Sequence, residues 1–505
     1  MFSLRDWQKR AVVKLTNKRF ALLKATTGSG KSVAIAKIAH DFFVSKKGTN
    51  PKVIVAVPAK GIGQNFTNIQ IIEGNVNFKP RADKTLTGDM PNKSDIILTH
   101  MQENETTFEN SIVICCHQSL IKAVKRNPDK FKNCIVIADE FHHCNGDEEK
   151  NELGKVVESL TVNNTNHILM VTATPYRSDG AELFPAEIAS QVVKFNYSLS
   201  EYLADCKHLR EIKFEEKFYH HERTFHPALK EYFSVTGIDK SIVFLPHVRL
   251  HNRRVEVGNV LAAALDLEPR DADGDLLMLE ELKNPSEGNF VRLNPDDETF
   301  WLYRNNKTGR KLIVIDLDDD NEIRNHRLKW LSNNKDVDEN TDVLIISLQV
   351  FIEGGDFPAI GRVINLSIDQ SFLRMIQKWG RATRDFRSKT EAVFVQFMNT
   401  HEGYSLQNAD AYSESKLQDI IDLQELDVDL DAVELQQIAI MRKQIYLAST
   451  KTIAPERSTD DVEIAVIPKQ DVNSFWIKNW RSVFNFTLAG AAVGFLVQII
   501  ALLIK

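Results

Sequence analysis

The residues best suited to chemistry form a short glycine-containing stretch near the amino terminus, Ala25-Thr26-Thr27-Gly28-Ser29-Gly30-Lys31-Ser32. Glycine and small side chains let backbone N–H groups turn inward around phosphate oxygens, and a following helix adds its positive dipole end. In such a loop Lys31 reaches the β- and γ-phosphates and the Ser32 hydroxyl ligates Mg²⁺. The pattern has Gly where this chain has Ala25, a minor departure. We therefore predict a nucleotide-phosphate site; the alternative is a glycine turn that happens to carry Lys-Ser.

Two adjacent carboxylates, Asp139 and Glu140, follow the apolar run 133–138. One carboxylate at a strand end can hold the Mg²⁺ that bridges phosphates, and the next can orient and deprotonate the attacking water. Asp-Glu after an apolar run is common, and the upstream phosphate loop is what makes it informative. His142 and His143 follow directly, but no further ligands have the spacing of a zinc site.

Two other positions extend the predicted nucleotide site. Gln8 lies about one short helix ahead of the phosphate loop, and its amide can pair with both the donor and the acceptor on the adenine edge. This predicts ATP as the nucleotide, whereas taken alone Gln8 reads as a surface residue. Further along, Thr172 and Thr174 end an apolar run, so that their hydroxyls can link the nucleotide site to neighbouring segments.

The elements that must position these residues are short apolar, β-branched runs separated by helix-compatible stretches. The runs are 20–23, 52–57, 112–116, 133–138 and 167–171, and the stretch 33–43 follows the phosphate loop as a helix. Alternation of this kind predicts a parallel sheet with helices on both faces. Ligands bind such sheets at the carboxyl ends of the strands, which is where the loop and the acidic pair fall.

A second set of runs predicts a second sheet further along the chain. Its strands are expected at 241–245, 312–315, 342–346 and 362–366. Residues from about 195 to 235 are predicted to be a polar connector whose histidines lie in a solvated loop. The stretch near 258–311 is polar and acidic in parts, and we predict a solvated insertion with the potential to contact a partner.

These motifs resemble those of a superfamily 2 helicase of the DExH type. The resemblance rests on the Walker A loop at 25–32, Asp-Glu-x-His at 139–142 and Thr-Ala-Thr-Pro at 172–175. The amino-acid sequences of these motifs are most similar to those in the helicase lobes of type I and type III restriction-enzyme motor subunits and their DNA-repair relatives. The resemblance covers about four-fifths of the chain. It implies an α/β fold of two RecA-like lobes in tandem, which we place at residues 1–195 and 196–404.

The resemblance also implies site residues in the second lobe. Gly355 and Asp356 resemble the motif that couples nucleotide to nucleic acid, and Arg381 and Arg384 resemble the arginine-finger motif. Because the two arginines lie one helical turn apart, both are expected to face the cleft between the lobes. There they would neutralise the charge that develops on the γ-phosphate. Residues on the surface expected to grip the nucleic-acid backbone are Lys60, Arg177 and His247.

Composition limits where nucleic acid can bind. The net charge is −6, with 63 Lys and Arg against 69 Asp and Glu, so a basic surface must be a local cleft. DNA is preferred because the resemblance leans to restriction and repair motors, and RNA remains an alternative. Five cysteines without metal-type spacing indicate a reducing compartment.

The last hundred residues have a different character. Residues 405–474 are acidic and polar, and within them 417–447 carries an apolar stripe at helical spacing. This helix either lies across the motor lobes or contacts a partner. Residues 483–504 contain no charge and as a helix would extend about 33 Å, against a bilayer core of roughly 30 Å. They predict a single membrane span with the lobes in the cytoplasm, since Lys478 and Arg481 precede it; the alternative is a buried helix.

The sequence therefore predicts an ATP- and Mg²⁺-dependent helicase or translocase on DNA, anchored to a membrane at its carboxyl end. Two competing hypotheses remain. One is a membrane-held sensor that uses ATP to switch conformation on nucleic acid without separating strands, and the other is an RNA helicase. An inactive scaffold fits poorly with a full set of phosphate, metal, water and arginine-finger residues.

Overall fold

The computed structural model describes most of the first four hundred residues. The described residues are 1–58, 66, 68–87, 90–141, 156–157, 159–160, 166–173, 186–220, 225–245, 250–270, 277–297, 299–317, 321–334, 337–348, 351, 357–366, 377–387 and 389–400. All of them belong to one compact unit that spans residues 1–453. The predicted helix 417–447 and span 483–504 lie outside the described residues. Within the described part, none of the helices is both long and apolar enough to cross a bilayer.

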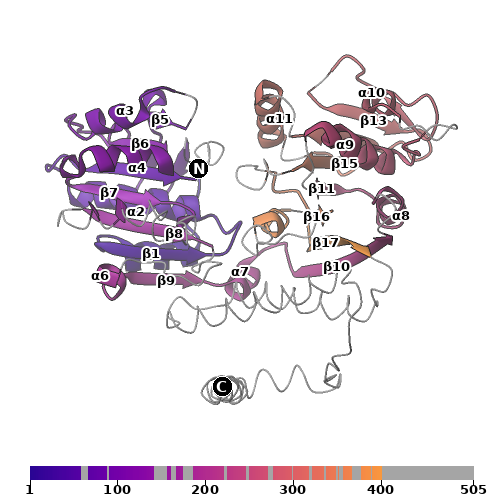
Figure 1. Ribbon diagram of the computed structural model, residues 1–505. Helices are drawn as coiled ribbons and strands as arrows, with labels where there is room; N and C mark the ends of the chain where they lie inside the picture. Colours follow the sequence, from indigo (N-terminus) through magenta and orange to yellow (C-terminus); the bar gives the residue numbers. More distant parts are fainter. Residues whose placement is uncertain are drawn as a thin grey trace, which may run out of the picture. The chain divides into compact units, whose positions relative to one another are not determined.

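The first sheet has seven strands that all run parallel, in the order β5-β6-β2-β7-β8-β1-β9 (Figure 1). The strands are β1 (Phe20–Ala25), β2 (Lys52–Val57), β5 (Thr85–Leu86), β6 (Ile112–Cys116), β7 (Cys134–Ala138), β8 (His167–Thr172) and β9 (Val193–Tyr197). Apolar residues fill the central strands because both faces of the sheet are covered. All five strands predicted for this region are confirmed.

Helices cover both faces of this sheet. The helices are α1 (Asp6–Leu15), α2 (Lys31–Ser45), α3 (Lys93–His100) and α4 (His117–Arg126). Successive strand residues point to opposite faces, so Leu23 packs in the cluster that contains α1 and α2, while Leu22 packs with α3 and α4. Parallel strands with helices on both faces confirm the predicted α/β architecture for this part of the chain.

Shorter elements complete the first half. They are β3 (Ile69–Ile71), which pairs antiparallel with β4 (Val76–Phe78), the 3₁₀ turns η2 (Ala82–Lys84) and η3 (Pro128–Lys130), α6 (Ala186–Ala189) and α7 (Leu199–Asp205). Helix α7 follows β9 directly and begins with a capping box in which Ser198 and Glu201 bond each other's backbone N–H. It leads from the first sheet toward the second.

The second sheet has eight strands in the order β10-β17-β16-β11-β15-β14-β13-β12. The strands are β10 (Glu211–His220), β11 (Lys240–Phe244), β12 (Phe290–Arg292), β13 (Trp301–Asn305), β14 (Lys311–Asp316), β15 (Thr341–Ser347), β16 (Arg362–Asn365) and β17 (Glu391–Thr400). The run from β10 to β14 is parallel, whereas β13 and β12 continue it antiparallel. The four strands predicted here are confirmed.

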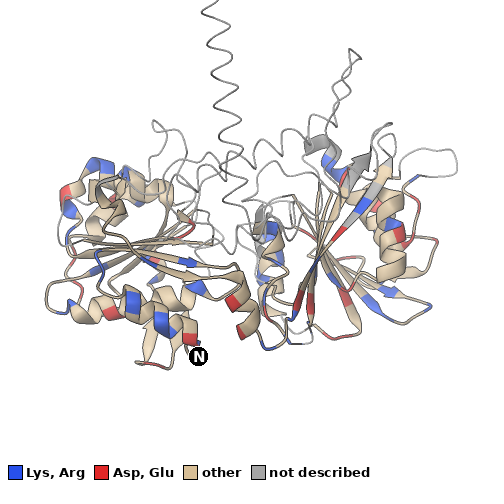
Figure 2. Ribbon diagram, turned by 90° about the horizontal axis from the view of Figure 1, so that it is seen from below, with Lys and Arg blue, Asp and Glu red and all other residues tan. Residues whose placement is uncertain are grey.

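Helices also cover both faces of the second sheet. They are α8 (His226–Thr236), α9 (Leu250–Leu265), α10 (Leu279–Lys283) and α11 (Asn321–Asn333). Leu229 of α8 and Leu261 of α9 share a cluster with Leu344, whereas Leu331 of α11 shares the other with Ile345. Figure 2 shows Lys and Arg interspersed with Asp and Glu on the described helices, in keeping with the low net charge.

Two predictions about the second half are wrong. Residues 195–235 are not a polar connector, because they contain β9, α7, the ten-residue strand β10 and helix α8. The stretch 258–311 is not a solvated insertion throughout, because it begins inside α9 and contains β12 and β13, which extend the sheet. Trp301 and Tyr303 of β13 are 2% and 0% exposed, so β13 belongs to the core. In both stretches, charged residues alternate with the apolar ones and obscure the pattern.

Candidate active site

The phosphate-type loop lies between β1 and α2, as predicted. Gly28 and Gly30 have φ of +78° and +92°, backbone conformations that favour glycine. The buried Ser29 Oγ donates to the Thr26 carbonyl at 2.7 Å, and Lys31 Nζ donates to the Ala25 carbonyl at 3.1 Å. These hydrogen bonds fold the loop back toward β1 at the start of a 15-residue helix. A compact loop at a helix amino terminus is an arrangement that binds phosphate oxygens.

The amino-terminal helix holds this loop in place. Gln8 is 2% exposed, its Nε2 donates to the Gly30 carbonyl at 3.0 Å, and its Oε1 accepts from the Arg5 N–H at 2.8 Å. Arg5 in turn donates from Nη1 to the Ser29 carbonyl at 3.3 Å. Gln8 is thus a buried residue that fixes the loop, and its assignment to adenine stays a prediction. Arg5 was not predicted, although it is only three residues ahead of Gln8.

The acidic pair lies at the carboxyl end of β7, where the sequence placed it. The Asp139 N–H donates to the Ala56 carbonyl of the neighbouring strand at 2.9 Å, and Asp139 Oδ1 accepts from the Glu140 N–H at 3.1 Å. Glu140 has φ of +50°, an uncommon conformation for a residue with a side chain. Phe141, which follows, is fully buried in the core, so its side chain serves packing.

Electrostatics connect the acidic pair to the phosphate loop. Burial and, after it, the neighbouring Glu140 charge raise the pKa of Asp139 to about 7, although the Lys31 ammonium and the hydrogen bond from the Glu140 N–H oppose the shift. A raised pKa means that the ionised carboxylate is under-compensated by protein groups. A divalent cation would supply the missing charge, and a carboxylate with a Ser32 hydroxyl is an oxygen donor set that suits Mg²⁺. The residues present therefore fit the predicted metal.

A segment from the second half of the chain packs directly against the phosphate loop. A Cβ built on Gly28 would lie 3.0 Å from Arg384 Cγ and 3.5 Å from Arg384 Cα. A Cβ built on Gly380 would overlap the Thr27 side chain. Glycine is thus required both in the phosphate loop, at Gly28, and in the segment that packs against it, at Gly380. The structure brings together the Walker-type loop and the arginine-finger segment, which are separated by about 350 residues in the sequence.

The two predicted arginines are not placed by a continuous helix. Residues 377–379 are helical, but 380–382 form a turn, and the Arg381 N–H donates to the Lys378 carbonyl at 3.0 Å. The expectation that one helical turn separates the two arginines is therefore wrong, whereas their shared role at the γ-phosphate stays a prediction. Arg384 lies beside Gly28, whereas the guanidinium of Arg381 lies 6.0 Å from the ring centroid of Phe351. The tight packing of Gly380 on the loop favours a turn.

Several predicted site residues lie outside the described residues. They are Lys60, Thr174, Arg177, His247, Gly355 and Asp356, together with His142 and His143. Thr172 is described, and it is fully buried at the end of β8, where its strand pairs with β1 just before the phosphate loop. The predicted contacts to nucleic acid thus stay predictions.

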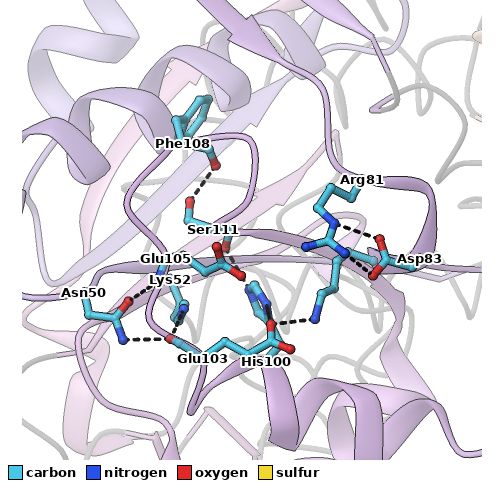
Figure 3. Close-up of polar contacts among 10 residues, drawn as sticks. Asn50, Lys52, Arg81, Asp83, His100, Glu103, Glu105, Phe108 and Ser111 are labelled. Carbon is cyan, nitrogen blue, oxygen red and sulfur yellow. Dashed lines mark hydrogen bonds and ion pairs between the residues drawn. The ribbon is translucent and has the colours of Figure 1, made fainter.

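A second group of charged side chains lies at the amino end of β2 and β6 (Figure 3). Lys84 Nζ donates to Glu103 Oε2 at 2.6 Å, and Lys52 Nζ donates to the Glu103 carbonyl at 2.6 Å. The buried His100 donates from Nε2 to the Ser111 carbonyl at 3.0 Å, because a carbonyl can only accept. Each of these charged groups has a protein partner.

This group has the spacing of a metal site but not its charge. Ligand atoms of His100, Glu103 and Glu105 lie within 4.8 Å of one another. However, the Lys84 ammonium already lies on the Glu103 carboxylate and holds its pKa below the ordinary value. Lys84 thus supplies the positive charge that a metal would bring, and we interpret the group as a structural ion cluster.

The chain is similar to known proteins over about four-fifths of its length. Residues 1–177 match the sequence model of the family described as "Type III restriction enzyme, res subunit". A protein of Bacillus subtilis (strain 168), described as "Putative ATP-dependent helicase YeeB", is 28% identical over 406 residues, which cover 79% of this chain and 61% of that protein. The predicted resemblance to superfamily 2 helicases and restriction-enzyme subunits is confirmed.

Solved structures share the fold. The DUF1998 helicase MrfA bound to DNA has a TM-score of 0.52 at 14% identity, covering 82% of this chain and 51% of that one. The ATP-dependent Type ISP restriction-modification enzyme LlaBIII bound to DNA has a TM-score of 0.53 at 15% identity, covering 88% and 33%. The chain spans less than two-thirds of each of these relatives. At 14–15% identity these similarities confirm the α/β fold alone.

Proposed function

We propose that this chain is an ATP-dependent helicase or translocase that acts on nucleic acid, with DNA as the preferred substrate. The observation that carries the proposal is the approach of Arg384 and Gly380 to Gly28 and Thr27 of the phosphate loop. An arginine held beside the phosphate loop by a distant part of the chain would let hydrolysis respond to movement between the two parts.

Each residue has a distinct role in this proposal. Lys31 and the loop N–H groups bind the phosphates, and Ser32 with Asp139 holds Mg²⁺, which neutralises phosphate charge when bound. Glu140 orients and deprotonates water, and Arg384 neutralises charge on the γ-phosphate. Lys31 partly offsets the rise in the pKa of Asp139, which requires the two side chains to be near each other. This supports placing Lys31 and Asp139 in one site.

The choice of DNA rests on the relatives. Two solved structures with the same fold are described as bound to DNA, and the matched family is named for a restriction enzyme. Proteins of this kind hold the phosphate backbone and read little sequence. We therefore expect stimulation by DNA of any sequence.

The test is ATP hydrolysis by the intact protein in detergent with single- and double-stranded DNA and RNA, followed by strand displacement on forked substrates. We expect DNA to stimulate hydrolysis more than RNA does, and displacement or translocation to accompany it. Stimulation without movement on any substrate would favour the sensor hypothesis, and stimulation by RNA alone would favour an RNA helicase. No hydrolysis on any substrate would overturn the proposal.

We also propose that residues 483–504 anchor the chain in a membrane, with the lobes in the cytoplasm. The support is the length of this uncharged stretch and the Trp and basic residues before it. Fractionation of expressing cells tests it, with a deletion of 475–505 as the control. We expect the intact chain to need detergent for extraction and the deleted chain not to; the intact chain in the soluble fraction without detergent would reject the anchor. The helix predicted at 417–447 is the proposed place for a protein partner.

A further inference from the structure

The residues on either side of Arg384 are tied to the first half of the chain by one tyrosine. Tyr202 of α7 is fully buried, its hydroxyl donates to the Thr383 carbonyl at 2.7 Å, and the same hydroxyl accepts from the Asp385 N–H at 2.9 Å. The two bonds bracket Arg384 in the sequence, so the tyrosine fixes its backbone from both neighbours. Burial raises the pKa of Tyr202, which keeps the hydroxyl protonated and able to donate.

Asp385 makes a second tie to the same region. Its carboxylate accepts the backbone N–H groups of Lys207, His208 and Leu209 at 2.9, 2.9 and 3.0 Å. These three residues follow α7 and lead into β10, so they are the connection between the two sheets. Burial raises the pKa of Asp385, but the three N–H groups outweigh it and hold that pKa below its ordinary value.

The tyrosine also connects to the phosphate loop. The rings of Tyr202 and Tyr197 meet edge to face with centroids 6.4 Å apart, and Tyr197 stacks on Trp7 at 4.6 Å. The Tyr197 carbonyl accepts the Thr26 N–H of the loop at 3.3 Å. Trp7 precedes Gln8, the residue that bonds the loop at Gly30. A continuous set of contacts therefore runs from the phosphate loop through Tyr197 and Tyr202 to the backbone beside Arg384.

The second sheet holds the same segment from its other side. Lys389 Nζ donates to the carbonyls of Ala382, Ile360 and Pro358 at 2.8, 2.9 and 3.0 Å. The segment that carries Arg384 is thus bonded both to its own sheet and to the connection between the sheets. A shift of α7 relative to the second sheet has to strain one set of bonds or the other.

We propose that Tyr202 and Asp385 form a latch: they are positioning residues that hold the backbone around Arg384 at the phosphate loop. The inference rests on the proposed ATP hydrolysis and adds how the guanidinium reaches the site. Neither residue touches the nucleotide in this account. The latch acts through Arg384, which makes its effect on turnover dependent on the presence of that arginine.

The first experiment compares steady-state ATP hydrolysis of the intact protein with that of Tyr202→Phe, which keeps the ring and removes both hydrogen bonds. We expect kcat to fall by about 10- to 100-fold while KM for ATP changes by less than about threefold, because a misplaced group costs transition-state stabilisation rather than binding. Asp385→Asn is expected to act in the same direction.

The matched control is Tyr303→Phe. Tyr303 is also fully buried and its hydroxyl donates to a backbone carbonyl, that of Lys283 at 3.0 Å, but it lies in β13. We expect this variant to lose stability comparably and to keep kcat. Equal kcat for wild type and Tyr202→Phe would overturn the proposal, as would an equal loss of kcat in Tyr303→Phe.

The second experiment places Tyr202→Phe in an Arg384→Ala background. If the latch acts through the arginine, the tyrosine change causes no further loss of kcat there, so the two effects are non-additive. Fully additive losses would show that Tyr202 acts by another route and would reject the latch.

A third measurement judges the latch independently of catalysis. Hydrogen exchange of the amides of residues 207–209 and 380–387 is expected to be faster in both Tyr202→Phe and Asp385→Asn than in wild type. Unchanged exchange would overturn the latch even if hydrolysis occurs. Conversely, a wild-type protein that hydrolyses no ATP overturns the proposed function, whereas the exchange data still decide whether the latch exists.

Discussion

The two ends of the first sheet each carry a carboxylate, and the pKa values of these two carboxylates are shifted in opposite directions. At the amino end, Glu103 accepts from Lys84, and its pKa is lowered, first by that hydrogen bond. At the carboxyl end, Asp139 is buried beside a second carboxylate, and its pKa is raised to about 7. The same sheet thus holds one carboxylate whose charge the protein compensates and one whose charge it compensates only in part. We infer that the compensated end serves stability and the other serves a cationic ligand and its phosphates.

The largest expected effect is on ATP hydrolysis, which substitutions at the carboxyl end of the first sheet should lower and a substitution at its amino end should not. Lys31→Ala and Glu140→Gln should each lower ATP hydrolysis by more than about 100-fold, because they remove phosphate binding and water activation. Lys84→Met, at the amino end, should leave hydrolysis unchanged. Steady-state assays of the three variants check this. Wild-type turnover in Lys31→Ala or Glu140→Gln would reject the site assignment.

The next effect concerns stability at the carboxyl end. Asp139→Asn should stabilise the ligand-free protein by about 2 kcal/mol near pH 8, because it removes an under-compensated buried charge. A raised carboxyl pKa means that the folded state binds more protons between the ordinary value of 3.8 and about 7, so wild-type stability falls as pH rises through that window. The gain should therefore shrink toward pH 4.

Urea denaturation without nucleotide measures this difference across pH. The same variant should lose Mg²⁺-dependent nucleotide binding, which couples lower function to higher stability. A variant less stable than wild type at every pH would show that the carboxylate is compensated after all, and the contrast between the two ends would fail.

A smaller effect of opposite sign is expected at the amino end. Lys84→Met should destabilise the protein by about 1 kcal/mol, a figure already discounted for the partial exposure of Glu103. Lys213→Met is the matched control, because Lys213 pairs with Glu391 at an exposed position and should contribute nothing measurable. Denaturant midpoints of both variants test this. Equal midpoints for Lys84→Met and wild type would remove the stabilising role of the cluster.

The smallest effect is the pH response of this pair. The Glu103 pKa lies below its ordinary value of 4.5, so its contribution is present above that pH and is lost as pH falls through the lowered pKa. The midpoint difference between wild type and Lys84→Met should therefore vanish in strong acid. A difference that persists unchanged in strong acid would mean that Lys84 acts through packing alone.

Local patterns predicted the strands and the phosphate site because each depends on neighbouring residues. Runs such as 52–57 and 342–346 are continuous and apolar, as buried parallel strands require. Strand β10 was missed because it lies at the edge of its sheet, where charges such as Lys213 and Glu215 are tolerated on a strand. The apolar residues of α9 and β13 were missed because acidic stretches around them dominate the composition.

The parts of the site that escaped prediction depend on residues far apart in the chain. Tyr202 and Asp385 are separated by 183 positions, and nothing in the spacing around either residue indicates the other. The segment at Gly380 was expected to be helical because the local sequence permits a helix, whereas it forms a turn where Gly380 packs against Thr27. Such contacts follow from tertiary packing, which a single sequence does not record.

We propose that Arg384 completes an ATP site whose other residues come from the first sheet. The most direct test is ATP hydrolysis by Arg384→Ala in the presence of DNA, with nucleotide affinity measured in parallel and Arg387→Ala as an exposed control three residues away. In Arg384→Ala we expect kcat to fall by about 10³-fold while nucleotide binding is largely retained. In Arg387→Ala we expect kcat near the wild-type value. Wild-type turnover in Arg384→Ala would contradict it.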